Sequence, residues 1–320
     1  MAIKYYLDPP TLLNFAITIN AIRIIQMRRK EFIKIMATLP LSGIASPASS
    51  LRKFSTELTA TDKFPVLFLG HGSPMNAIED NEFVQGFRKI GQTFEKPKAI
   101  LVISAHWETR GTFVTAMEHP STIHDFGGFP QALFDVQYPA PGSPSLAQET
   151  QRIVTKTEVH LDDKWGLDHG SWSVVRHLYP NADVPIIQMS IDYTQPASYH
   201  YAIAQQLAEL RKKGVLIIGS GNMVHNLRMV AWDKLNTTGY AYEWATIAND
   251  KMKTLIQDGN HQALINFRQQ GKEFDLAIPT PEHYLPLIYS LALQEKNEDL
   301  FLFNDNAIAG SLTMTSVKIG

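Results

Sequence analysis

The chain of 320 residues contains no cysteine. Disulfide bonds, thiolate nucleophiles and cysteine-based zinc sites are therefore excluded together. Any metal ion has to be bound by histidine, aspartate or glutamate, a donor set that suits Fe(II), Mn(II) or Zn(II). The lack of cysteine does not assign a compartment, because a chain without thiols is compatible with reducing and oxidising surroundings alike.

A surplus of basic charge and a long apolar run are also missing. The 29 basic and 31 acidic residues give a formal net charge of -2, which is not the electrostatic pattern of a nucleic-acid-binding protein. No stretch reaches the roughly 18 apolar residues of a membrane-spanning helix. We therefore expect no nucleic-acid partner and no membrane span, whereas the 44% hydrophobic content indicates a globular core.

Residues 1–60 differ from the rest of the chain, and we interpret them as an N-terminal leader. From Met27 they read MRRKEFIKIMATLPLSGIASPASS, with a basic start, a short apolar middle and then small residues. This is the layout of an export signal, and RKEFIK resembles a twin-arginine motif with lysine in place of the second arginine. An amphipathic N-terminal helix is the alternative. The expected location is cytoplasmic, or periplasmic if translation starts at Met27 and the segment is an export signal.

Residues 61–320 alternate between strand-like and helical patterns, and we interpret them as one catalytic domain. Strands are predicted at 66–69, 99–104, 112–117, 185–191, 215–218, 300–303 and 311–317, and helices at 82–94, 145–155, 199–212, 242–258 and 282–293. An Asp-Asn pair is expected to cap the first helix, and Gly259 to end the fourth. Strands alternating with long helices predict a single three-layer α/β/α domain around a mostly parallel or mixed sheet.

The placement of the eleven histidines carries most of the functional information. His71, His106 and His225 each follow a predicted strand within a few residues. Because the carboxyl ends of the strands form the ligand crevice of an open α/β sheet, these three side chains are expected to converge. His169 lies in the turn-rich segment GLDHGSW, and His283 in PTPEHYLP at the start of a helical pattern. Such a cluster can bind a divalent metal and leave an unligated imidazole to move protons.

Six motifs point to a known family when they are taken in order: GHGSPMNA, SAHWE, HPSTIHDFGGFP, YPAPGSP, DHGSW and GSGNMVHN. Together they resemble the class III extradiol ring-cleavage dioxygenases, in the 4,5-DOPA dioxygenase branch of the LigB superfamily. The resemblance covers about residues 62–320. It implies a non-haem Fe(II) enzyme, in which zinc is also found, that opens a DOPA-like catechol with O₂.

The resemblance also implies roles for individual residues. His71 and His106 are the expected metal ligands, and His283 is the expected third ligand, with Glu282 as the alternative. His225 is the expected active-site base, close enough to bind the metal when no substrate is present, and His169 is expected to face substrate and oxygen as a second proton carrier. The proline-rich segment 118–144 is expected to cover the ring and to supply the substrate-binding residues His124, Asp125, Phe126 and Phe129.

Several alternatives stay open at this point. A Memo-like metal-binding protein of the same fold would use the histidines without dioxygenase activity. A tetrapyrrole metal chelatase would explain GHGS alone, and a serine hydrolase using Ser73 or Ser171 lacks the G-x-S-x-G turn after a strand. Arg176 or Arg228 could pair with a substrate carboxylate, but no spacing selects one of them.

Overall fold

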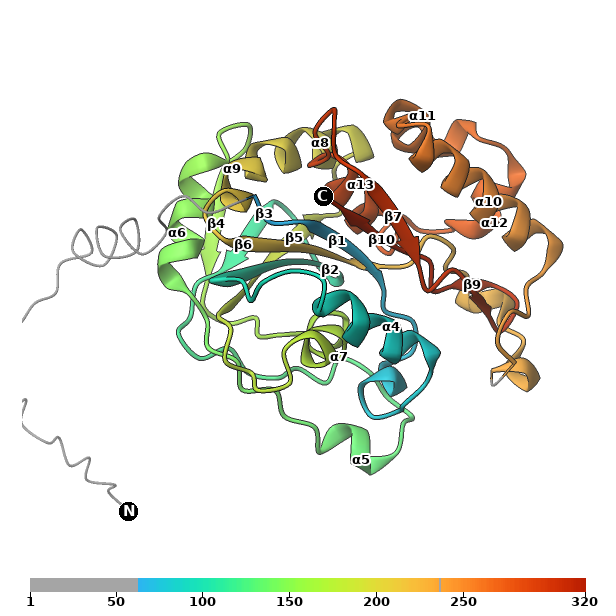
Figure 1. The fold of residues 1–320 in the computed structure, drawn as a ribbon, viewed down its shortest axis with the longest axis horizontal. Helices are drawn as coiled ribbons and strands as arrows, with labels where there is room; N and C mark the ends of the chain where they lie inside the picture. Colours follow the sequence, from blue (N-terminus) through green and yellow to red (C-terminus); the bar gives the residue numbers. More distant parts are fainter. Residues whose placement is uncertain (1–62, 236) are drawn as a thin grey trace, which may run out of the picture. The chain divides into compact units, whose positions relative to one another are not determined.

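The computed structural model describes residues 63–235 and 237–320. The predicted leader in residues 1–60, including the signal from Met27, lies outside the described residues. Within the described part, none of the helices has the length and apolar character needed to cross a membrane. The predicted α/β class is confirmed, because helices cover both faces of a mixed sheet (Figure 1).

The main sheet of the described residues has eight strands in the order β4-β3-β5-β2-β6-β1-β10-β7. Its centre is parallel, since β2 pairs in parallel with β5 and β6, and β6 with β1. Antiparallel pairs occur where β3 meets β5 and where β10 lies between β1 and β7. The strands are β1 Val66–Gly70, β2 Ala99–Thr109, β3 Thr112–Thr115, β4 Val159–Asp162, β5 Ile186–Asp192, β6 Val215–Gly221, β7 Leu300–Phe303 and β10 Ser316–Ile319, and a separate two-stranded sheet pairs β8 Ala307–Ile308 with β9 Leu312–Thr313.

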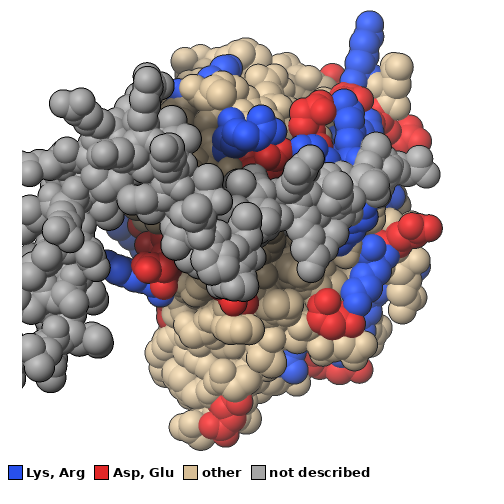
Figure 2. Space-filling view, turned by 90° about the vertical axis from the view of Figure 1, so that its left-hand side faces the viewer, with Lys and Arg blue, Asp and Glu red and all other residues tan. Residues whose placement is uncertain are grey.

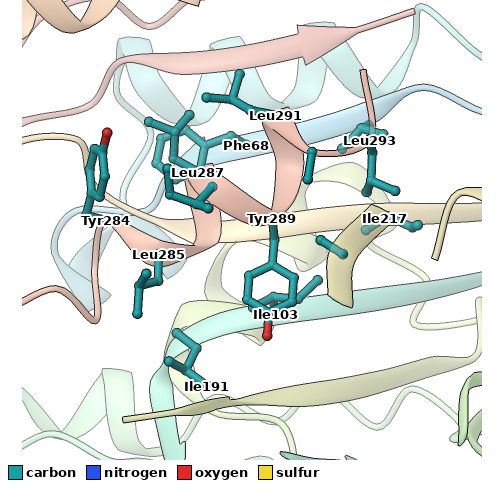
Figure 3. Close-up of a cluster of buried hydrophobic side chains, with 14 of the residues drawn as sticks. Phe68, Ile103, Ile191, Ile217, Tyr284, Leu285, Leu287, Tyr289, Leu291 and Leu293 are labelled. Carbon is teal, nitrogen blue, oxygen red and sulfur yellow. The ribbon is translucent and has the colours of Figure 1, made fainter. Parts of the chain in front are cut away.

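Alternating side chains of the central strands build two cores, one on each face, because successive residues of a strand point to opposite sides. On one face Phe68 and Ile103 pack in the core that contains helix α13 (Leu285–Leu291), as Figure 3 shows. On the other face Leu67 and Val102 pack in the core that contains α4 (Glu82–Gly91) and α7 (His169–Leu178). The sheet is thus the middle of three layers, as the sequence predicts.

The expected helix ends are confirmed at two places. The side chain of Asn81 accepts hydrogen bonds from the backbone N–H groups of Phe83 and Val84 at the start of α4. Helix α10 (Glu243–Gln257) ends just before Gly259, whose φ of 65° suits a glycine after a helix. The other α-helices are α5 Gln131–Phe134, α6 Pro144–Ile153, α8 Ala197–Ala204, α9 Ala208–Arg211, α11 His261–Ile265 and α12 Lys272–Ala277; the 3₁₀ helices are η1 Pro74–Ala77, η2 Gln205–Leu207, η3 Leu227–Met229, η4 Trp232–Lys234 and η5 Phe267–Gln269.

Two histidines lie in elements that the sequence pattern did not predict. Strand β2 continues to Thr109 across a register shift between Ile103 and Glu108, so His106 lies inside an irregular part of the strand and not after it. The turn-rich segment around His169 is instead the first turn of α7, where the side chain of Asp168 accepts from the N–H of Ser171. Both predictions were wrong. Pairing with β5 extends the strand past His106, and the buried cap Asp168 starts a helix at His169, although the local sequence pattern indicates neither.

Charged side chains of both signs lie intermixed on the face drawn in Figure 2. Ion pairs among the described residues include Glu149 with Arg152 and Lys213, and Glu209 with Lys212. Among the described residues visible in that view, no continuous basic surface forms.

Candidate metal centre

Five histidines converge at the carboxyl ends of β1, β2 and β6. The ring centroid of His71 lies 5.0 Å from that of His106, 5.6 Å from that of His169 and 5.3 Å from that of His283. The His225 ring stacks on His283 with 3.5 Å between centroids and 9° between planes. The chain thus gathers side chains that are up to about two hundred residues apart in the sequence into one cluster.

Glycines at the end of β1 allow the chain to turn and place His71. A Cβ atom on Gly70 would lie 2.6 Å from the carbonyl oxygen of Met314, and Gly72 has a φ of 62°. Only glycine tolerates both the close approach and the left-handed backbone without strain. The turn is fastened by the side-chain amide of Asn76, which donates to the carbonyl oxygen of His71 at 2.9 Å.

The hydrogen bonds of Ser220 define which nitrogen of His71 carries a proton. The Ser220 hydroxyl donates to the carbonyl oxygen of Gly170, so its oxygen accepts from His71 Nδ1, 3.0 Å away. Because a neutral imidazole has one N–H, the lone pair of His71 is on Nε2. Burial and the neighbouring histidines lower the pKa of His71 well below its ordinary value, so the ring is neutral.

The Nε2 atom of His71 faces the Nε2 atom of His106 at 3.1 Å. The other nitrogen of His106 lies 3.4 Å from Asp125 Oδ2, and burial together with the neighbouring His169 lowers the pKa of His106 to about 3. Two imidazole nitrogens at this distance share either a proton or a cation, depending on the tautomer of His106. Nitrogens about 2.1 Å from one metal ion are about 3 Å apart when the angle between them is near 90°. The pair therefore fits a shared metal ion.

Glu282 orients His283 toward the same cluster. The carboxylate of Glu282 lies 3.1 Å from His283 Nδ1 and also accepts from the hydroxyl of Thr280 at 2.9 Å. With Nδ1–H directed at Glu282, the lone pair of His283 is on Nε2. Burial, followed by the nearby His225, lowers the pKa of His283 well below its ordinary value.

His225 lies beside this ring on the chain that follows β6. The backbone N–H of His225 donates to the carbonyl oxygen of Ala277 at 2.9 Å, which fixes the position of this segment. Burial lowers the pKa of His225 to about 4. A neutral imidazole stacked at the centre is available to accept a proton.

Asp125 ties the proline-rich segment to the first turn of α7. Its two carboxylate oxygens accept from the backbone N–H and from Nδ1 of His169, each at 2.9 Å. Burial alone would raise the pKa of Asp125, but the hydrogen bonds from His169 hold it below the ordinary value. The carboxylate therefore fixes the orientation of His169.

A second, fully buried carboxylate supports this turn from below. Asp168 accepts hydrogen bonds from the hydroxyl of Ser104 and the amide of Gln188, both at 2.7 Å. Burial, together with the charge of Asp125, raises the pKa of Asp168. Asp168, Ser104 and Ser220 were not singled out from the sequence, because only the sheet brings them beneath the histidines.

Aromatic rings form one wall of the site. Phe126 contacts His169 edge-on with 5.6 Å between centroids, and it lies 5.5 Å from Phe129 and 5.1 Å from Phe134. His124 lies behind Phe126, where its Nε2 donates to the carbonyl oxygen of Val136 at 2.9 Å. The proline-rich segment thus brings flat apolar surface next to His169.

The two candidate arginines lie elsewhere. Arg176 is in the last turn of α7 and lines a cavity. Among the described residues that line this cavity, none is one of the five clustered histidines. Arg228 is exposed in η3, three residues after His225.

Two groups of side chains have metal-binding spacing. The ligand atoms of His71, His106 and His169 lie within 4.8 Å of one another, and so do those of His225, Glu282 and His283. Together they offer five imidazoles and one carboxylate, a donor set suited to iron, manganese or zinc.

Comparison with known proteins identifies the family. Residues 65–304 match the family model described as the catalytic LigB subunit of aromatic ring-opening dioxygenase. The chain belongs to the LigB family. It is an extradiol ring-cleavage dioxygenase, as the resemblance of its motifs implies, and the chelatase and hydrolase alternatives are not supported.

Two relatives of this LigB protein and one solved structure extend the match. The 4,5-DOPA dioxygenase extradiol of Escherichia coli strain K12 is 48% identical over 267 residues, which span 82% of this chain and 97% of that protein. The 4,5-DOPA dioxygenase extradiol of Beta vulgaris is 36% identical over 259 residues, spanning 78% and 94%. A crystal structure of an uncharacterized protein from E. coli K12 superposes with a TM-score of 0.70 at 42% identity, covering 81% of this chain and all of that one.

Proposed function

We propose that this protein cleaves a catechol ring next to its diol with O₂, using one Fe(II) ion held by His71, His106 and His283, and that its substrate resembles DOPA. The observation that carries the proposal is the pair of Nε2 atoms of His71 and His106, 3.1 Å apart, in a cluster of neutral imidazoles. Bound iron would supply the electron-transfer chemistry that brings O₂ and an aromatic diol together.

His283 is a better third ligand than Glu282. The Glu282 carboxylate is engaged by His283 Nδ1 and by Thr280, and a carboxylate on the far nitrogen of a ligating histidine is the usual outer partner. The ring centroids of His283 and His106 are 5.0 Å apart, which leaves its free nitrogen within reach of the same ion.

His225 and His169 divide the proton transfers between them. No carboxylate of the described residues hydrogen-bonds to the His225 ring, and with a pKa of about 4 this ring is neutral at pH 7 and able to accept a hydroxyl proton from the catechol. His169 has the Asp125 carboxylate on Nδ1, which holds its ring in place to return a proton to the opening ring.

The catechol ring would lie against Phe126, with His124 and Phe129 behind it. The edge of Phe126 contacts His169, so an aromatic substrate stacked there has its diol directed at the histidines. In this arrangement Asp125 acts on the substrate through His169, because both of its oxygens already accept from that residue.

The test combines metal analysis with turnover. The purified protein is stripped of metal, reconstituted with Fe(II) without oxygen and then mixed with L-DOPA and air, with a zinc-loaded sample as the control. We expect a coloured ring-opened product only with iron. A fully iron-loaded protein that is inactive on a panel of catechols would exclude the proposal and favour a Memo-like metal-binding role.

Two matched variants test the assignment of ligands and proton carriers. His106→Ala should lose bound metal, because half of the facing nitrogen pair is removed. His169→Ala should keep its metal but lose at least about 100-fold in turnover, the usual contribution of a general acid or base. Full iron content in His106→Ala would contradict the ligand assignment.

A further inference from the structure

A second cavity lies between α4, η1 and the end of α7, apart from the histidine cluster. Its volume is about 660 Å³, a size typical of small-molecule sites. Its wall combines apolar side chains with several polar and charged ones. The lining residues that matter here are Ala77, Ile78, Tyr138, Arg176, His177 and Leu178.

Among the described residues that line this cavity, Arg176 carries a guanidinium nitrogen with no hydrogen-bond partner. Its Nη1 atom is buried and has no hydrogen-bond partner among the described residues. The other arginine of the wall, Arg88, donates to Asp80 at 2.7 Å, and the rim carboxylate of Glu79 lies 3.3 Å from the amide of Asn81. A buried guanidinium nitrogen without an acceptor is costly, so an acceptor from outside the chain, water or a ligand, is needed at this atom.

We propose that this cavity binds a small organic carboxylate, with its anionic group on Arg176 and its apolar body against Ile78 and Leu178. A guanidinium presents parallel N–H groups that match the two oxygens of a carboxylate. The apolar side chains of Ile78 and Leu178 favour a ligand with a hydrocarbon or aromatic body over an inorganic oxyanion. This site is distinct from the catechol site and does not depend on the proposed reaction.

Hydrogen bonds connect the cavity to the metal centre. His177 lines the cavity and donates from Nε2 to the carbonyl oxygen of Asn76 at 2.8 Å. The side chain of Asn76 in turn donates to the carbonyl oxygen of His71 at 2.9 Å. A ligand that contacts His177 is therefore two hydrogen bonds from the backbone of a proposed metal ligand.

The test measures binding of benzoate and of inorganic phosphate to the full-length, metal-free protein by isothermal titration calorimetry. We expect saturable benzoate binding that weakens at least tenfold in Arg176→Met, which keeps the length of the side chain but removes the charge. Arg110→Met, at an exposed position between β2 and β3, is the control and should bind benzoate like the parent protein. Ile78→Trp, which leaves Arg176 intact and fills the rim, should also weaken binding.

Each result decides the proposal. Benzoate binding that survives both Arg176→Met and Ile78→Trp would put the ligand elsewhere and overturn it, as would binding of phosphate without benzoate or no saturable binding of either. An unchanged or higher melting temperature of Arg176→Met would support the proposal. Removing an arginine that stabilises the fold lowers the melting temperature, whereas removing a buried charge whose nitrogen lacks an acceptor does not.

Discussion

At the scale of single residues, the partner of the second ring nitrogen sets what each histidine can do. His71 donates to a neutral hydroxyl on Ser220, whereas His169 and His283 face the carboxylates of Asp125 and Glu282. Either acceptor leaves the lone pair on the other nitrogen of the ring that it faces. Imidazoles with different partners thus each present a defined nitrogen to the site.

The role of Ser220 can be tested directly. Ser220→Ala removes the acceptor for His71 Nδ1–H, so the ring can rotate or change tautomer, and metal affinity should fall by about 10- to 100-fold. Competition with a coloured chelator measures this. Ser190→Ala removes another buried strand hydroxyl, one that accepts from the N–H of Phe113, and should leave metal affinity unchanged. Equal affinity in Ser220→Ala and the parent protein would contradict the tautomer argument.

At the scale of elements, the site depends on how closely the ends of strands approach neighbouring segments of the same chain. A Cβ atom on Gly221, the last residue of β6, would lie 2.1 Å from the carbonyl oxygen of His283. The N–H of Asn222 donates to that same oxygen at 2.9 Å. The glycine therefore allows β6 to hold the backbone of His283 directly against the sheet.

A methyl group on residue 221 should push β6 away from the segment that contains His283. We expect Gly221→Ala to lower the free energy of unfolding by about 1–3 kcal/mol, the usual cost of overpacking, and to weaken metal binding because His283 moves. Urea denaturation and metal titration measure the two effects. For Gly127→Ala, where a Cβ atom would meet nothing within 4 Å, we expect a stability within about 0.5 kcal/mol of the parent protein. If Gly221→Ala has the same free energy of unfolding and the same metal affinity as the parent protein, the contact between β6 and the carbonyl oxygen of His283 is not tight.

At the scale of the whole domain, a buried ion pair joins segments from opposite ends of the described chain. The Arg211 side chain is fully buried; it donates to the carbonyl oxygens of Phe64 and Leu293 and forms an ion pair with Glu298. Burial alone would raise the pKa of Glu298, but hydrogen bonds from Arg211, the backbone of Glu295 and Lys63 lower it to about 2. The charged carboxylate is thus favoured by folding.

This pair predicts how stability depends on pH. Because the pKa of Glu298 is depressed from 4.5 to about 2, its contribution is complete above about pH 4.5 and disappears as the pH falls toward 2. Glu298→Gln should lower the free energy of unfolding by about 2 kcal/mol at pH 7, with the difference shrinking below pH 4.5. Urea denaturation between pH 3 and 7 measures it.

The matched control is an ion pair at the surface. Glu209 pairs with Lys212 at 3.0 Å, and both side chains are at least half exposed. Glu209→Gln should change stability by less than about 0.5 kcal/mol at any pH. A constant difference between Glu298→Gln and the parent protein across this pH range would rule out the assigned pKa.

Much of the fold could be predicted from the sequence because its signals are local. Buried strands such as 66–69 and 215–218 are continuous apolar runs, and the Asn81 cap and Gly259 mark helix ends by their own chemistry. The extension of β2 through His106 and the start of α7 at His169 could not be predicted. Their hydrogen bonds come from β5, Asp168 and Asp125, which lie far away in the sequence.

The sequence by itself determined the α/β class, the family and the histidines that are candidates for the site, because these follow from periodicity and from ordered motifs. Only the tertiary structure decided which nitrogen of His71, His169 and His283 is free. That depends on Ser220, Asp125 and Glu282, whose contacts with the rings are set by the sheet and by loop packing. It also separated Arg176 from the histidine cluster and placed it in another cavity, because only folding buries its Nη1 atom away from every hydrogen-bond partner in the described part of the chain.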